Sequence, residues 1–273
     1  MPILSLIFGA IVGLSLGLTG GGGAIFAVPL LVFGLSVDPR QAVGISLAAV
    51  GTTSLVGFFG CWKVGEVEVA TGLMFAMAGM VGAPIGSWLS AQITESLLLT
   101  LFGLLMLVVA VRMWRKAGSA TARVTCGVDD PDGPTCRRDA VGNLRLNSPC
   151  AMLLAFVGVV TGVLSGLFGV GGGFVIVPAL VLYSGMAIHR AVGTSLLVIT
   201  LVSASGVASH LVAGREIPVD TTLYFVVGGV MGMFVGIWTS RFLSGPVLQR
   251  VFAVAIVAVA MFVILRTTPY FSS

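Results

Sequence analysis

Apolar runs of about twenty residues recur along the whole sequence, and none carries Asp, Glu, Lys or Arg near its middle. A helix of this length crosses the roughly 30 Å hydrocarbon layer of a bilayer, and its backbone groups bond within the segment, as lipid requires. Only 9% of the residues are charged, against roughly 25% in soluble domains. We therefore expect an all-α polytopic membrane protein. The apolar segments lie at about 3–19, 24–35, 42–60, 67–89, 96–114, 150–168, 174–184, 191–212, 219–240 and 246–265.

One polar stretch divides the chain into two parts. Residues 115–148, which include "CGVDDPDGPTCRRDAVGN", form a linker between a first transmembrane repeat at 1–114 and a second at 149–273. Seven of the 14 Lys and Arg residues lie in or beside this linker. Basic loops stay on the cytoplasmic side of a membrane, so we expect the linker to be cytoplasmic.

The two apolar sets match each other in one register, with a single slip. A shift of 149 residues places "AVGIS" (42–46) on "AVGTS" (191–195). Further matches at a shift of 149, or of 150 after one inserted residue, are Gly13 with Gly162, Gly17 with Gly166, Gly20 with Gly169, Pro29 with Pro178, Gly86 with Gly236 and Trp88 with Trp238. We interpret the matches as an internal duplication, which is typical of secondary transporters whose substrate site lies where the halves meet.

The relative orientation of the halves depends on the two short segments, 24–35 and 174–184. Twelve helical residues span only about 18 Å, too little to cross the bilayer core untilted. If each short segment returns to the side where it started, the repeat is inverted; if it completes one broken crossing with the preceding helix, the repeat is parallel. We take the inverted repeat as our prediction. Each half then has a broken or re-entrant helix followed by three membrane-spanning helices.

Contiguous glycines interrupt each half just before its short segment. Isolated glycines already weaken a helix by roughly 1 kcal/mol each, and irregular backbone at membrane depth is tolerated only inside protein or beside a wet cavity. A helix that begins after such a break presents N–H groups and the positive end of its dipole, which suits an anion. We predict a substrate site at the two breaks and at the hydroxyls that open the next helix. The predicted site residues are Gly20, Gly21, Gly22, Gly23, Ser46, Gly169, Gly171, Gly172, Gly173, Thr194 and Ser195.

Spaced glycines have a different interpretation. Small residues four apart let helix backbones approach closely, so we assign packing roles to Gly9-Gly13-Gly17, Gly158-Gly162-Gly166, Gly82-Gly86 and Gly228-Gly232-Gly236.

Several function classes are disfavoured by the residues that are missing. A membrane-buried acid or base usually marks a proton relay or a cation site, and the apolar segments have none near their middle. The sequence contains no nucleophile–base–acid set and no P-loop, so we expect neither an enzyme nor an ATP-driven pump. We expect no cofactor, no metal and no nucleic-acid partner. The expected partners are a small anion and membrane lipids, and a homo-oligomer stays open.

The glycine motifs resemble those of a known family. A duplicated "GxxxGLxGxGGGxxxxPxL" followed by "AVGTS" is similar to the sulfite exporter TauE/SafE family, also described as toluene-sulfonate uptake permeases. The second copy, "GVLSGLFGVGGGFVIVPALVLYSGMAIHRAVGTSLLVI", is close to that pattern. The first copy diverges slightly, with Ala24 where the second has Gly173. The resemblance covers nearly the whole chain except the linker.

This resemblance implies a multi-pass protein of the bacterial inner membrane that moves small sulfur-containing or organic anions, such as sulfite, sulfonates or sulfoacetate. A potential of 100 mV, negative inside, favours export of an anion by roughly 2.3 kcal/mol per charge, so we expect export. Two alternatives stay open at this point. One is an anion channel, and the other is a non-transporting membrane scaffold whose glycines serve packing alone.

Overall fold

The computed structural model describes a chain whose assigned elements are all helical. It describes residues 2–119, 148–173, 176–177, 180, 186, 188–214, 218–240, 257–258 and 261. The long helices are α1 (Pro2–Thr19), α3 (Pro39–Lys63), α4 (Val69–Gln92), α5 (Glu95–Ser119), α6 (Ser148–Phe168), α8 (Ile188–Val212) and α9 (Val219–Ser240). Between α1 and α3 lie the short elements η1 (Gly22–Phe26), α2 (Ala27–Pro29) and η2 (Leu30–Gly34).

The helical, membrane-spanning character of the chain is confirmed. Among the described residues, α1, α3, α4, α8 and α9 are long and apolar enough to cross a bilayer. Shorter apolar helices cover Gly23–Gly34, Ser96–Val108 and Met152–Phe168. Most of the predicted linker, most of the predicted segment 174–184 and nearly all of the segment 246–265 lie outside the described residues.

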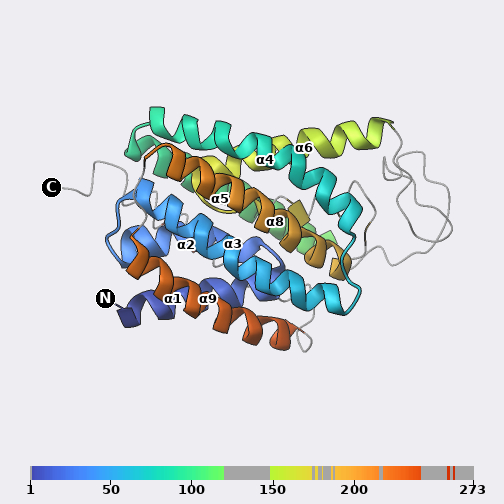
Figure 1. Cartoon of the computed structure of the whole chain (residues 1–273), viewed down its shortest axis with the longest axis horizontal. Helices are drawn as coiled ribbons and strands as arrows, with labels where there is room; N and C mark the ends of the chain where they lie inside the picture. The colour runs from blue at the N-terminus through green and yellow to red at the C-terminus, as the bar shows by residue number, and fades with distance from the viewer. Residues whose placement is uncertain are drawn as a thin grey trace.

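The long helices form three layers (Figure 1). α3 and α8 pack against each other in the middle, α1 and α9 pair on one side, and α4 and α6 pair on the other. The central position of α3 is reflected in its burial, since 67% of an apolar 18-residue stretch of this helix is buried, against 33% for the corresponding stretch of α9. α5 reaches the interior through Phe102, whose ring stacks at a tilt on Phe168, with 5.6 Å between centroids.

The helix ends follow local sequence signals. Asp38 caps α3, because its carboxylate accepts a hydrogen bond from the Arg40 N–H (2.9 Å), and Pro39 occupies the first helical position. α3 and α8 are each followed by a glycine with positive φ, Gly65 at 76° and Gly214 at 67°. These glycines adopt the left-handed conformation that commonly ends a helix.

The outer pairs are built on the spaced glycines, which confirms their predicted packing role. A Cβ placed on Gly13 would collide with the carbonyl oxygen of Gly229, so α1 and α9 touch backbone to backbone. A Cβ on Gly162 would likewise collide with the carbonyl oxygen of Gly79, where α6 meets α4. Such small residues permit the close approach that holds helices together in lipid.

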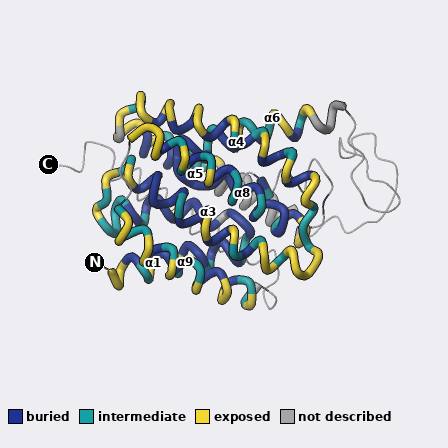
Figure 2. Tube along the Cα trace, in the orientation of Figure 1, coloured by how far each residue is buried: buried dark blue, intermediate teal, exposed yellow. Residues whose placement is uncertain are grey.

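The opposite faces of these helices are exposed (Figure 2), and many of their exposed residues are large and apolar, as lipid contact requires. On α4 the exposed residues Met77, Val81 and Ile85 recur every four positions. Trp88 and Trp238, which the 150-residue register matches, are exposed to nearly the same fraction, 64% and 65%. Tryptophans near the ends of spanning helices are common at membrane interfaces.

The outer pairs are parallel, but the central pair is antiparallel. Residues later in α1 contact residues later in α9, and the same order holds for α4 and α6. Along α3 and α8 the contacts run in opposite directions, because Gly51 faces Ser203 while Leu47 faces Gly206. The 149-residue register pairs α3 with α8. Antiparallel packing of matched helices is what an inverted repeat requires, although the duplication itself stays a prediction.

Candidate functional site at the paired glycine breaks

Both predicted breaks are irregular backbone that only glycine adopts readily. α1 ends at Thr19, and Gly20 and Gly21 follow with φ of 69° and 152°. After α6, Gly169, Gly171 and Gly172 have φ of 70°, 69° and 69°. A side chain at such φ values clashes with its own backbone. The glycine clusters therefore end their helices.

The two breaks begin in the same way. The Gly20 N–H donates to the Leu16 carbonyl (2.7 Å), and the Gly169 N–H donates to the Ser165 carbonyl (2.8 Å). Each bond closes the last turn of its helix, α1 or α6, on a left-handed glycine. From Gly22 onward the first break continues as the short helix η1. Gly23 lies against the last turns of α1, where a Cβ would collide with the backbone of Leu16.

The breaks meet inside the protein at Gly21 and Gly173, which are 152 residues apart in the sequence. A Cβ on Gly21 would lie 2.6 Å from the Gly173 Cα, and one on Gly173 would lie 2.5 Å from the Gly21 Cα. Both glycines are buried. The two clusters therefore meet in a backbone-to-backbone contact.

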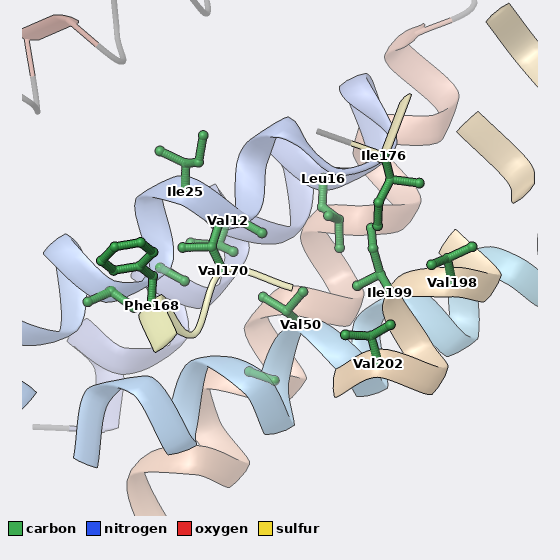
Figure 3. Packing of buried hydrophobic residues seen from close by; sticks show 14 of the residues in the cluster. Val12, Leu16, Ile25, Val50, Phe168, Val170, Ile176, Val198, Ile199 and Val202 are labelled. Atoms are coloured by element: carbon green, nitrogen blue, oxygen red, sulfur yellow. The ribbon is translucent and has the colours of Figure 1, made fainter. Parts of the chain in front are cut away.

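Each break also packs against the central helix of the other half. A Cβ on Gly20 would lie 2.5 Å from a Val192 methyl carbon on α8, and a Cβ on Gly169 would lie 2.7 Å from the Val43 Cα on α3. The 149-residue shift places Gly20 on Gly169 and Val43 on Val192, so the two contacts correspond to each other. Figure 3 shows the surrounding apolar packing, in which Val170 of the second break lies among side chains of the neighbouring helices.

The two predicted serines form reciprocal hydrogen bonds across the halves. Ser46 Oγ donates to the Gly169 carbonyl (2.6 Å), and Ser195 Oγ donates to the Gly20 carbonyl (2.5 Å). Ser195 Oγ also lies 2.7 Å from the Val192 carbonyl of its own helix. Both serines are fully buried. Because a hydroxyl has one O–H, each serine in this conformation satisfies a carbonyl instead of being open to an anion.

Thr194 lies in a different environment from the other predicted residues. Its hydroxyl oxygen accepts a hydrogen bond from the Glu68 N–H (3.0 Å), directly before α4. A Cβ on Gly72 of α4 would lie 3.0 Å from the Thr194 methyl carbon. Thr194 thus joins α8 to the start of α4.

Four serines outside the predicted set, Ser54, Ser90, Ser165 and Ser203, are buried and have no hydrogen-bond partner for their hydroxyl oxygens in the described part of the chain. Of these, Ser54 on α3 and Ser203 on α8 lie on the two central helices. Ser203 Oγ lies 3.5 Å from the Cβ position of Gly171. The sequence did contain a signal for Ser54 and Ser203, because these two serines are 149 residues apart and so occupy matched positions.

The electrostatics of the site depend on dipoles. Within the described ranges, the middle thirds of α1, α3, α4, α6, α8 and α9 contain no Asp, Glu, Lys or Arg. The same ranges hold no group of three His, Cys, Asp or Glu that could bind a metal. An anion at the breaks would be held by N–H and O–H groups, which act strongly in a low-dielectric interior.

Comparisons with known proteins give a consistent result. The family model "Sulfite exporter TauE/SafE" matches residues 5–263. A probable membrane transporter protein of Xylella fastidiosa (strain 9a5c) is 38% identical over 277 residues, covering 98% of this chain and 98% of that protein. The probable membrane transporter protein YunE of Bacillus subtilis (strain 168) is 31% identical over 221 residues, covering 78% and 79%. A probable membrane transporter protein of Methanocaldococcus jannaschii is 30% identical, covering 79% and 74%. No solved structure gives a significant match.

Proposed function

Because the chain belongs to the sulfite exporter TauE/SafE family and is a membrane transporter, we propose that it is a secondary transporter or facilitator for small sulfur-containing or organic anions. Sulfite, sulfonates and sulfoacetate represent the substrate class, and export is the proposed direction. The observation that carries the proposal is the meeting of the two glycine breaks between the central helices.

The contact between Gly21 and Gly173 supports a substrate site because its surface is backbone on both sides. Glycine lets a ligand approach the amides closely, and amides suit an oxyanion. In the present conformation the breaks close on each other. An anion binds between them only after they part, and Ser46 and Ser195 then exchange their carbonyl acceptors for the oxyanion.

The same contact supports a transport cycle. Reciprocal hydrogen bonds join Ser46 to Gly169 and Ser195 to Gly20. If the halves rock against each other, one bond opens towards one side of the membrane and the other bond opens towards the other side. Alternating access around a fixed central site is the usual mechanism of transporters built from repeats.

Flux measurements on purified protein in liposomes test the proposal. We expect saturable efflux of radiolabelled sulfite, methanesulfonate or acetate, accelerated by an inside-negative potential because roughly 2.3 kcal/mol per charge is available at 100 mV. An efflux rate that does not change with the membrane potential, or that depends strictly on a proton gradient, contradicts passive export. A proton-linked mechanism would direct attention to His210, which is fully buried in the last turn of α8.

The same preparation separates the two alternatives. An anion channel gives single-channel currents and flux that does not saturate. A scaffold gives no flux, and Gly172→Ala then lowers only stability, because the φ of 69° at this position is strained for any side chain. In a transporter, Gly172→Ala in a protein that still purifies as folded loses anion flux. Gly60→Ala is the matched control, because nothing lies within 4 Å of its Cβ position.

A further inference from the structure

We propose that Ser203 on α8 is a substrate-binding residue whose hydroxyl donates to the transported oxyanion, and that Ser54 on α3 has the same role for the other half. This inference rests on the proposed function, since it assigns donors at the same central site. Within the proposed substrate class it favours the singly charged members, such as hydrogensulfite and alkylsulfonates, over doubly charged ones such as sulfoacetate.

The first argument is the unfavourable free energy of burying the Ser203 hydroxyl without a hydrogen-bond partner. Its side chain is fully buried, yet its Oγ has no hydrogen-bond partner among the described residues. A buried hydroxyl without a partner is unfavourable, and most buried polar groups in proteins have one. The transported oxyanion supplies this partner while it is bound, which accounts for a buried hydroxyl that is otherwise unpaired.

The second argument comes from hydroxyls that do have partners. In a membrane helix a hydroxyl usually bonds to the carbonyl four residues earlier, and Thr200, one turn before Ser203, does so with Leu196 (2.8 Å). On α3, Thr52 bonds in the same way to Ala48 (2.7 Å), two residues before Ser54. Ser203 and Ser54 depart from this pattern. Their orientation therefore leaves the hydroxyls open for another acceptor.

The third argument is position. Ser203 Oγ lies 3.5 Å from the Cβ position of Gly171, in the second break, and 3.8 Å from that of Gly51 on α3. Ser203 Oγ thus lies between a glycine break and the opposite central helix. Val50 and Ile199 border the same glycine, since each has a side-chain carbon 3.0 Å from the Gly171 Cβ position.

These neighbours restrict the ligand. Valine and isoleucine side chains give the surface around Gly171 an apolar character that suits an alkyl group or a sulfur atom beside the charged oxygens. The free-energy cost of moving an ion out of water rises with the square of its charge. A site built from neutral donors, with no cation among the described central residues, therefore favours a monoanion such as methanesulfonate over a dianion such as sulfate.

Flux of radiolabelled methanesulfonate and sulfate into proteoliposomes of the full chain tests both statements. We expect Ser203→Ala to raise the KM for methanesulfonate roughly tenfold to hundredfold, the worth of a hydrogen bond to a charged group. Its Tm without ligand stays the same or rises, because the lost hydroxyl had no partner. Ser54→Ala is expected to act in the same direction. The wild-type protein is expected to carry methanesulfonate well and sulfate poorly.

Ser205→Ala is the matched control, since Ser205 lies on the same helix but donates to the Met80 carbonyl (2.9 Å). We expect it to lower the Tm and leave the KM unchanged. A Ser203→Ala protein with the wild-type KM overturns this inference alone, and efficient sulfate flux overturns the preference for monoanions. If the wild-type protein gives no saturable flux and no ligand-induced rise in Tm with sulfite, methanesulfonate or acetate, the proposed function is overturned and this inference with it.

Discussion

Glycine does two different things in this protein. Along α1 and α9, and along α4 and α6, glycines spaced four apart stay inside regular helices and let two backbones touch. At the centre, contiguous glycines have positive φ, end their helices and bring one break against the other. The first arrangement repeats the same contact at every turn, whereas the second combines one contact between the breaks with packing against α3 and α8 and two hydroxyl–carbonyl bonds.

The difference between the outer pairs and the centre indicates which parts of the fold are rigid and which can move. Parallel helices in contact over several turns separate only if all their turns separate, which suits a rigid body. The contact between Gly21 and Gly173 involves one residue from each break, and its opening also disturbs the packing of the breaks against Val192 and Val43. In the transport cycle that we propose, the outer pairs are the moving bodies, and the glycine breaks are the place where they part.

The largest effect is expected from Gly169→Ala. The substitution combines a left-handed φ of 70° with a Cβ 2.7 Å from the Val43 Cα, so we expect a loss of about 2–5 kcal/mol in stability. Gly65→Ala is the control, because its φ of 76° is similar but nothing lies within 4 Å. That variant should lose about 1–2 kcal/mol. Equal losses of thermal stability in detergent would mean that the centre is loosely packed.

A somewhat smaller loss is expected from Gly13→Ala at the α1–α9 contact. The φ here is helical, so the penalty comes only from the collision with the Gly229 carbonyl oxygen, and we expect about 1–3 kcal/mol. Thermal unfolding in detergent measures the loss. If Gly13→Ala proves more damaging than Gly169→Ala, the outer pairs hold the fold more strongly than the centre does.

The reciprocal serine bonds should contribute equally from both halves. Ser46→Ala leaves the buried Gly169 carbonyl without its hydroxyl donor, and we expect a cost of about 1–2 kcal/mol. Ser195→Ala should cost a similar amount through Gly20. Unfolding of the single and double variants gives the coupling between the two bonds. A difference of more than about 1 kcal/mol between the single variants would contradict equal roles for the halves.

The smallest effect, of opposite sign, is expected from Gly60→Ala. Gly60 is exposed near the end of α3, and nothing lies within 4 Å of its Cβ position. Alanine favours a helix over glycine by up to about 1 kcal/mol, so the Tm should rise slightly. A fall in Tm would show that Gly60 has a role that its surroundings do not explain.

Much of this architecture could be predicted because hydrophobic length and glycine spacing are local signals. The predicted segments 42–60 and 67–89 correspond to Pro39–Lys63 and Val69–Gln92, and the spaced glycines pack as expected. The 149-residue register indicated which residues to compare between the halves. The duplication itself and the substrate site both stay predictions.

The hydrogen-bond partners could not be predicted, because they are set by contacts between distant segments. Nothing in the sequence around Ser46 indicates that its hydroxyl meets the carbonyl of Gly169, 123 residues away. The same limit applies to Ser203, whose neighbours come from α3 and from the second break. A pattern identifies hydroxyls in matched positions, but only the packed helices decide which of them are satisfied.

The pairing of α1 with α9 has a consequence for how this chain is made. The glycine face of α1, which ends at Thr19, is synthesised well before α9, the helix that covers it and begins at Val219. The Gly20 carbonyl likewise has no hydroxyl donor until Ser195 has been synthesised. α1 therefore enters the bilayer before its partner exists, and its glycine face contacts lipid or the insertion machinery until α9 has been synthesised.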